Sequence, residues 1–109
     1  DLWGSEMANE WITYLFDVNN MPDAQIGTAD DEHEFINDRT KVYTWENSDG
    51  VPMVKYGYTL LRAHNCSPYE MPILWDFMEH FSFEKAADGT VTRYYSPSAF
   101  EKDDAVALN

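Results

Sequence analysis

Residues 39–63 have the sequence RTKVYTWENSDGVPMVKYGYTLLRA, which decides the fold of the middle of the chain. β-Branched and aromatic residues are frequent from Arg39 to Glu46 and again from Val51 to Ala63, as is typical of strands. The sequence NSDG at 47–50 lies between the two runs and is a turn signal. The stretch therefore predicts a β-hairpin.

A capped helix is predicted soon after this hairpin. The sequence SPYE at 67–70 has a serine suited to the N-cap, a proline at the first helical position and a glutamate at the third, which together form a capping box. The apolar residues that follow have the spacing of one helix face; they are Met71, Leu74, Trp75, Met78 and Phe81. We interpret this stripe as core packing.

Another helix is predicted near the start of the chain, from Ser5 to about Val18. Ser5 suits the N-cap, and Glu6 and Glu10 suit the positive end of the helix dipole. Apolar residues recur at helical spacing; they are Met7, Trp11, Leu15 and Val18. The sequence NNMPD at 19–23 ends the helix, because asparagine tolerates a left-handed cap and proline cannot continue it.

Two further stretches are mostly polar. Residues 23–38 are acidic and are expected to form a loop with at most a short helical turn. Residues 84–109 are expected to be a tail extension, with a turn at Asp88-Gly89 and a short strand from Thr90 to Tyr95.

Composition excludes several classes of function. The 109 residues suffice for one small domain, and the net charge is −13 with only seven Lys and Arg residues. A nucleic-acid binder needs clustered basic residues, so we expect no nucleic-acid partner, and an anionic membrane surface is equally unsuitable. No apolar run approaches the roughly 20 residues of a membrane span, and no signal peptide is apparent. The single cysteine, Cys66, excludes a disulfide within the chain and a cysteine-based zinc cluster.

His64 is the main candidate for chemistry. It lies between the predicted second strand and the capped helix, where α/β sheets place reactive groups. An imidazole titrates near neutral pH and suits a general base. The alternative, a loop histidine hydrogen-bonded to neighbouring backbone, remains open. Cys66 as a nucleophile, or a metal site from His64, Cys66 and His80, has no supporting spacing, so no metal or cofactor is expected.

The sequence around His64 resembles that of a known enzyme family. The segments VPMVKY at 51–56, His64 and WDFMEHFS at 75–82 resemble the C-terminal part of α/β-hydrolases of the polyhydroxybutyrate depolymerase and feruloyl esterase group. The resemblance covers roughly residues 39–83. One difference is Ala63 before His64, where many members have glycine.

The resemblance implies that His64 is the histidine of a Ser-His-Asp triad. It also implies an acidic residue before the first helix, and Asp1 occupies that place. The alternative that Asp1 is only a terminal residue remains open. Weaker candidates for the acid are Asp23, Asp30, Asp31 and Asp49. His80 is expected to lie within the last helix and to pack at, or cap, its C-terminal end, and His33 has no matching role.

The serine of such a triad is missing. A nucleophile elbow needs Gly-x-Ser-x-Gly, and none of the five glycines forms that pattern. The resemblance thus implies an α/β fold in which residues 1–109 are one C-terminal segment of a hydrolase domain: helix, strand pair, histidine loop and final helix. The serine would lie on preceding sequence or on a larger partner chain, and this chain alone would be inactive.

Two functions follow as expectations. The first is a secreted serine esterase that hydrolyses carboxylic esters, such as hydroxycinnamoyl or acetyl groups on plant polysaccharide, or a polyester. In that case the strand edge and apolar helix faces need the rest of the fold to cover them. The alternative is a small non-catalytic carbohydrate-binding or interaction module that uses exposed aromatics. Helical spacing assigns Trp11 and Trp75 to the core, which leaves Trp3 and Trp45 as candidates for that surface.

Overall fold

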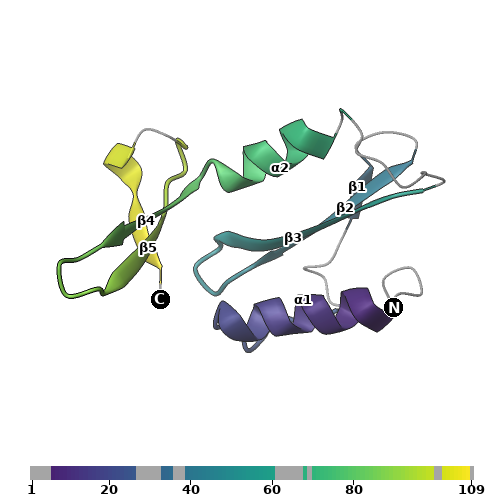
Figure 1. Cartoon of the computed structure of the whole chain (residues 1–109). Coiled ribbons are helices and arrows are strands. Elements are labelled where there is room, and N and C mark those ends of the chain that lie inside the picture. The colour runs from purple at the N-terminus through teal and green to yellow at the C-terminus, as the bar shows by residue number, and fades with distance from the viewer. Residues whose placement is uncertain are drawn as a thin grey trace. The chain divides into compact units, whose positions relative to one another are not determined.

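The computed structural model describes residues 6–26, 33–35, 39–60, 68, 70–99 and 102–108 of the chain. Within these residues it has two α-helices and two three-stranded antiparallel sheets, so the fold is a small mixed α/β fold (Figure 1). The chain divides into two compact units, residues 1–63 and 64–109.

The first unit contains helix α1 (Glu6–Val18) and strands β1 (His33–Phe35), β2 (Thr40–Glu46) and β3 (Pro52–Thr59). Both neighbouring pairs in the order β1-β2-β3 are antiparallel. The predicted first helix and the predicted hairpin are confirmed. The expectation of a loop for residues 23–38 was wrong at β1, whose three residues are too few to show an alternating pattern.

Two local structures set the ends of these elements. After α1, Asn20 has a φ of 54°, Asn20 N donates to Asp17 O (3.1 Å) and Met21 N donates to Phe16 O (2.9 Å), which is a Schellman cap. In the hairpin turn, Asn47 Oδ1 accepts hydrogen bonds from the backbone N–H groups of Asp49 (2.9 Å) and Val51 (3.0 Å). Both ends agree with the residues that predicted them.

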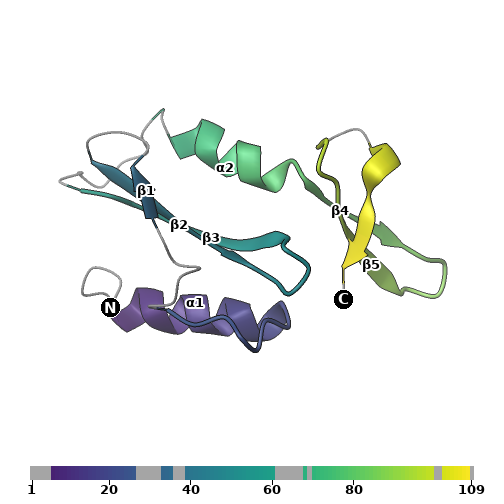
Figure 2. The ribbon, with the colours of Figure 1, turned by 180° about the vertical axis from the view of Figure 1, so that it is seen from behind.

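The core of the first unit lies between α1 and one face of the sheet. Figure 2 shows α1 running beside the strands. The buried cluster consists of Ile12, Phe16, Met21, Tyr43, Trp45 and Val54. The rings of Phe16 and Trp45 meet edge to face with centroids 5.4 Å apart, and Tyr43 stacks on Trp45 at 6.1 Å. The core side of α1 is therefore the side of Ile12 and Phe16.

The second unit contains α2 (Glu70–Met78), β4 (Phe81–Lys85), β5 (Val91–Tyr95), a short 3₁₀ turn η2 (Lys102–Asp104) and β6 (Val106–Leu108). The strands pair antiparallel in the order β4-β5-β6. A helix at the predicted place and the strand ending at Tyr95 are confirmed, while the predicted N-cap residue, Ser67, lies outside the described residues. The helix ends at Met78, however, so placing Phe81 on it was wrong; Phe81 begins β4 and pairs with Tyr95.

The β4–β5 turn and the end of α2 explain this difference. Gly89 has a φ of 91°, Ala86 N donates to Thr90 O (2.8 Å), and Thr90 N donates to Asp88 Oδ1 (2.9 Å), so a tight turn brings 81–85 beside 91–95. From Phe81 onward, the chain pairs with β5 as a strand instead of continuing the helix.

His80 lies in the turn between α2 and β4. Ser96 N donates to His80 O (2.7 Å), and His80 Nδ1 lies 2.8 Å from Ser96 O. Because a carbonyl oxygen only accepts, Nδ1 carries the proton in this bond. The expected position of His80 within the last helix was wrong, since the residue joins the end of α2 to the end of β5.

Candidate functional site

The residues predicted to carry catalysis lie mostly outside the described residues. His64, Asp1, Cys66, Asp30 and Asp31 are among them, so their predicted roles stay predictions. The strand before His64 and the helix after it are both described. Leu60 follows the end of β3, and its backbone N donates to Arg39 O (2.8 Å). Helix α2 begins at Glu70. The chain order strand, His64, helix therefore agrees with the predicted order.

The other candidate acids are on the surface. Asp23 and Asp49 are exposed, and Asp49 lies in the β2–β3 turn. In the described part of the chain, no three or more His, Cys, Asp or Glu residues are grouped so that they could hold a metal ion.

Among the residues that the structure describes, two ionisable groups have shifted pKa values, each with a structural cause. Burial raises the pKa of Tyr56, and the neighbouring Tyr58 and Tyr43 raise it further. Hydrogen bonds from the backbone and side chain of Thr90 lower the pKa of the Asp88 carboxyl in the β4–β5 turn. Both shifts are explained by packing and turn formation.

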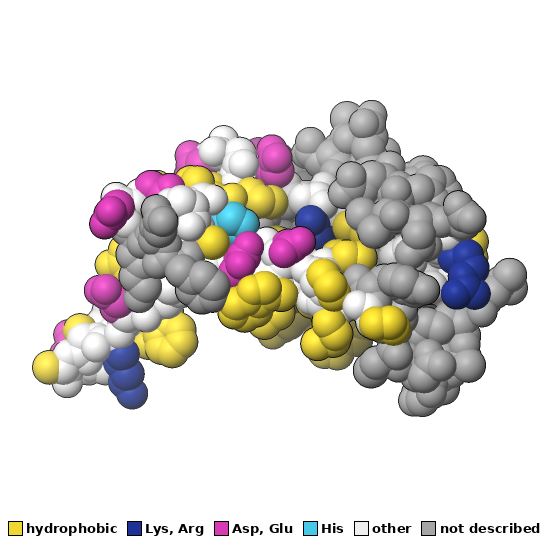
Figure 3. Space-filling model, turned by 90° about the horizontal axis from the view of Figure 1, so that it is seen from above, with side chains coloured by type: hydrophobic (Ala, Val, Ile, Leu, Met, Phe, Trp, Pro, Cys, Tyr) yellow, Lys and Arg dark blue, Asp and Glu magenta, His cyan; other side chains and the backbone are white. Residues whose placement is uncertain are grey.

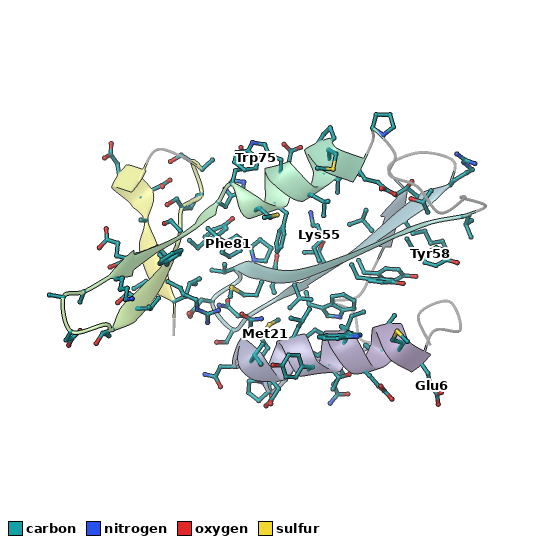
Figure 4. The ribbon with its side chains drawn as sticks, in the orientation of Figure 1. Glu6, Met21, Lys55, Tyr58, Trp75 and Phe81 are labelled. Carbon is teal, nitrogen blue, oxygen red and sulfur yellow. The ribbon has the colours of Figure 1, made fainter. Side chains whose placement is uncertain are left out.

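The outer side of α1 carries exposed apolar residues. At about 100° per residue, these side chains fall within one arc about 100° wide, next to the buried arc of Ile12 and Phe16; they are Met7, Trp11, Tyr14, Leu15 and Val18. The exposed acids Glu6, Glu10 and Asp17 form a stripe along the other edge of this arc. We call the apolar arc and its acidic edge the outer face of α1. In Figure 4, Met21 lies on the sheet side of α1 and Glu6 points away from it.

The core position predicted for Trp11 was therefore wrong. Trp11 is 61% exposed, although its spacing with Met7, Leu15 and Val18 predicted a core position. The helix has two apolar sides, and the sheet covers only one of them.

Helix α2 shows the same feature. Met71, Leu74, Trp75 and Met78 are all exposed, with Trp75 at 51%, so the interpretation of this stripe as core was also wrong. No residue of α2 is buried; Ile73 and Phe77 are half-buried on the other side, and the rings of Phe77 and Phe81 meet edge to face at 5.2 Å. Figure 3, viewed from above Figure 1, shows hydrophobic side chains at the surface beside acidic ones.

The exposure of three tryptophans is the opposite of what the sequence predicted. Trp45, expected to be available for binding, is fully buried, while Trp11 and Trp75 are exposed. Trp3 lies outside the described residues. Helical spacing identified the stripes correctly, but no signal in the sequence tells which of two apolar sides meets the sheet.

Comparisons of the chain with protein-family models, with curated proteins and with solved structures found no match. Among the residues that the structure describes, no helix is both long enough and apolar enough to cross a membrane.

Proposed function

We propose that this chain supplies the histidine of a serine esterase whose serine lies on preceding sequence or on a larger partner chain. The observation that carries the proposal is the uncovered side of α2, the helix that follows His64. A helix of nine residues is not stable by itself, and most helix stability in proteins comes from packing. The exposed stripe of Met71, Leu74, Trp75 and Met78 supports a partner surface against α2.

The magnitude of this missing burial is considerable. Full burial of a large apolar side chain contributes about 1.5–3 kcal/mol, and these four side chains are each more than half exposed. A covering surface would therefore add about 3–6 kcal/mol in total. That amount is comparable to the whole stability of a small domain.

The proposed α/β-hydrolase fold needs parallel strands, and the described part of this chain contains no parallel pair. Every strand pair described here is antiparallel. Parallel strands joined by crossover helices form the sheet of doubly wound folds. In this proposal, the partner or preceding segment contributes those parallel strands together with the serine.

The proposed mechanism is acyl transfer. His64 would take the proton from the serine hydroxyl as the serine oxygen attacks the ester carbonyl, and would then give that proton to the departing alcohol. Water would release the acyl group in a second, equivalent step. Asp1 would hold the histidine tautomer. The proposed substrates are carboxylic esters outside the cell, such as acyl groups on plant polysaccharide or a polyester.

A fluorophosphonate probe, which labels activated serines, tests the proposal on the native complex isolated from the source through a tag on this chain. We expect the probe to label a second polypeptide, or the preceding segment, and His64→Ala to abolish labelling. His80→Asn is the matched control, because asparagine keeps a donor for Ser96 O and His80 has no proposed catalytic role. Unchanged labelling in His64→Ala, or a complex that takes no probe, would contradict the esterase.

A second candidate function, a non-catalytic interaction module, is supported by the outer face of α1. Its apolar residues have offsets of 0, 4, 7, 8 and 11, the pattern by which an amphipathic helix binds a groove. The Trp11 and Tyr14 rings are nearly perpendicular, at 87°, so they do not form a flat platform for a sugar ring. We therefore favour a protein over a carbohydrate as the ligand of this face. A complex that forms without probe labelling would support this function.

A further inference from the structure

We propose that two copies of this chain bind head to tail, with the outer face of α1 in one copy against the exposed face of the β4–β5–β6 sheet in the next. The inference is independent of the esterase proposal, which concerns α2. It follows from the composition and charge of the two faces.

The sheet face is defined by the strand register. In antiparallel strands, paired residues point to the same side of the sheet. Phe81 pairs with Tyr95 and Tyr95 with Val106; Phe83 pairs with Arg93 and Arg93 with Leu108; Lys85 pairs with Val91. One side of the sheet thus carries all eight of these residues.

This side is both apolar and basic. Phe83 is 68% exposed, and Val91 and Val106 are each more than half exposed. Lys85 and Arg93 on the same side are also exposed. They are two of only seven Lys and Arg residues in a chain of net charge −13. We call this side the basic sheet face. The opposite side carries Glu84.

The outer face of α1 is complementary to the basic sheet face. It presents an apolar arc with an acidic edge of Glu6, Glu10 and Asp17, and α1 contains no basic residue. Placing the two together would bury Trp11 and Leu15 against apolar residues such as Phe83, with carboxylates near Lys85 and Arg93. Complementary charge of this kind fixes the orientation and partner of an interface.

Symmetric alternatives are disfavoured by the same charges. Two α1 outer faces packed together would bring acidic edges close to each other, and two basic sheet faces would juxtapose Lys85 and Arg93 with their copies. Like-charge juxtaposition at an interface is costly. A head-to-tail arrangement avoids both, and because one copy carries both faces, the contact can continue from copy to copy unless a ring closes.

The size of the faces predicts weak association. Helix α1 is about 20 Å long, and two strands of five residues with a third of three form a surface of at most about 14 by 17 Å, so each face buries at most about 400 Å². A stable interface buries about 800 Å² on each partner. We therefore expect weak association that is seen only in concentrated protein, with a mean mass that rises continuously with concentration.

Charge exchange between the two faces tests the pairing, with mass measured by sedimentation equilibrium on the full chain. We expect Glu10→Lys/Asp17→Lys and Lys85→Glu/Arg93→Glu each to weaken association by about tenfold or more. Mixing these two variants should restore association to within about threefold of the wild type, because each altered face then meets a complementary one. Glu46→Lys/Glu84→Lys makes the same change in net charge as the α1 variant, at exposed sites outside both faces, and it should not weaken association.

Three results would overturn the pairing. They are a wild-type chain that keeps its monomer mass up to 1 mM, a control variant that weakens association as much as the α1 variant, and a mixture that fails to associate. Circular dichroism of each variant shows whether it is folded. Serine labelling plays no part in these measurements, so their outcome is separate from that of the esterase proposal.

Discussion

Trp45 belongs to the core of the first unit, where its ring packs against the rings of Phe16 and Tyr43. The sequence placed it in a strand, which β2 confirms, but alternation along a strand does not say which side a helix will cover. The α1 helix covers the side of Tyr43 and Trp45, and Trp45 is fully buried. Its indole N–H has no hydrogen-bond partner among the described residues.

We predict that Trp45→Ala lowers the free energy of unfolding by about 3–5 kcal/mol, because it leaves a large cavity beside Phe16 and Tyr43. Trp45→Phe should cost less, since it retains a ring and removes an unpaired N–H group. Urea unfolding of dilute protein measures both. Trp11→Ala is the control at an exposed position and should change the free energy by less than about 0.5 kcal/mol. Equal effects of Trp45→Ala and Trp11→Ala would contradict this core.

Tyr56 gives a prediction for alkaline pH. Burial raises its pKa above 10.0, so near pH 10 the unfolded chain loses this proton while the folded chain keeps it. The unfolded state then binds fewer protons, and stability falls as the pH rises through 10 toward the folded pKa. Tyr56→Phe should make the decline between pH 9 and 11 shallower in urea unfolding. Tyr14→Phe, at an exposed position, should decline like the wild type; a Tyr56→Phe variant that does the same would refute this role of burial.

Helices α1 and α2 each carry apolar residues on two sides, of which one is exposed. The start and end of α1 were predicted to within a residue, because the capping pattern and the Asn20 turn are local. Which side is buried depends on the sheet, which is not local information. Strands β1, β4 and β6 were missed because three to five residues of mixed polarity show no clear alternation. Strand β4 also has the residues of the predicted helix end, and pairing with β5 overrode that pattern.

The β2–β3 turn gives a prediction about an element. Asn47 Oδ1 accepts two backbone hydrogen bonds, and Asn47→Ala removes both, so we expect a loss of about 1–3 kcal/mol in the free energy of unfolding. Ser48→Ala changes the next, exposed residue of the same turn and should cost less than about 0.5 kcal/mol. Urea unfolding compares the two variants. Similar values for both would mean that the asparagine side chain does not hold the turn.

The two units differ in how many side chains they bury. The first unit has an apolar cluster of six buried residues. In the described part of the second unit, Ser96 is the only buried side chain. The sequence indicated one segment with a tail extension over residues 84–109, because composition shows no linker at residues 63–64. Uneven burial is a property of the folded chain and could not be predicted from composition.

We therefore predict that amide hydrogens of 81–95 exchange faster than those of 40–59, by on the order of tenfold or more, since local stability follows buried contacts. Hydrogen exchange with mass spectrometry on dilute protein measures both segments. A low concentration of urea should remove protection from 81–95 first. Equal protection of both segments at every urea concentration would show that the chain unfolds as one unit.

The candidate site was predictable only in outline. The order of strand, His64 and helix follows from local patterns, and the bounds of β3 and α2 agree with it. The serine cannot be placed from a sequence that does not contain its motif. The exposed faces of α1 and α2 were visible as stripes, but their exposure depends on what each helix does not contact.

The bonds between His80 and Ser96 have a practical consequence for protein engineering. They join both ends of the β4–β5 hairpin at its base, while the tip, from Ala86 to Thr90, is exposed. Exposed tips with fixed ends tolerate inserted sequence. An epitope or a fluorophore-accepting peptide placed between Asp88 and Gly89 would thus report on the chain while leaving both helices and the first unit unaltered.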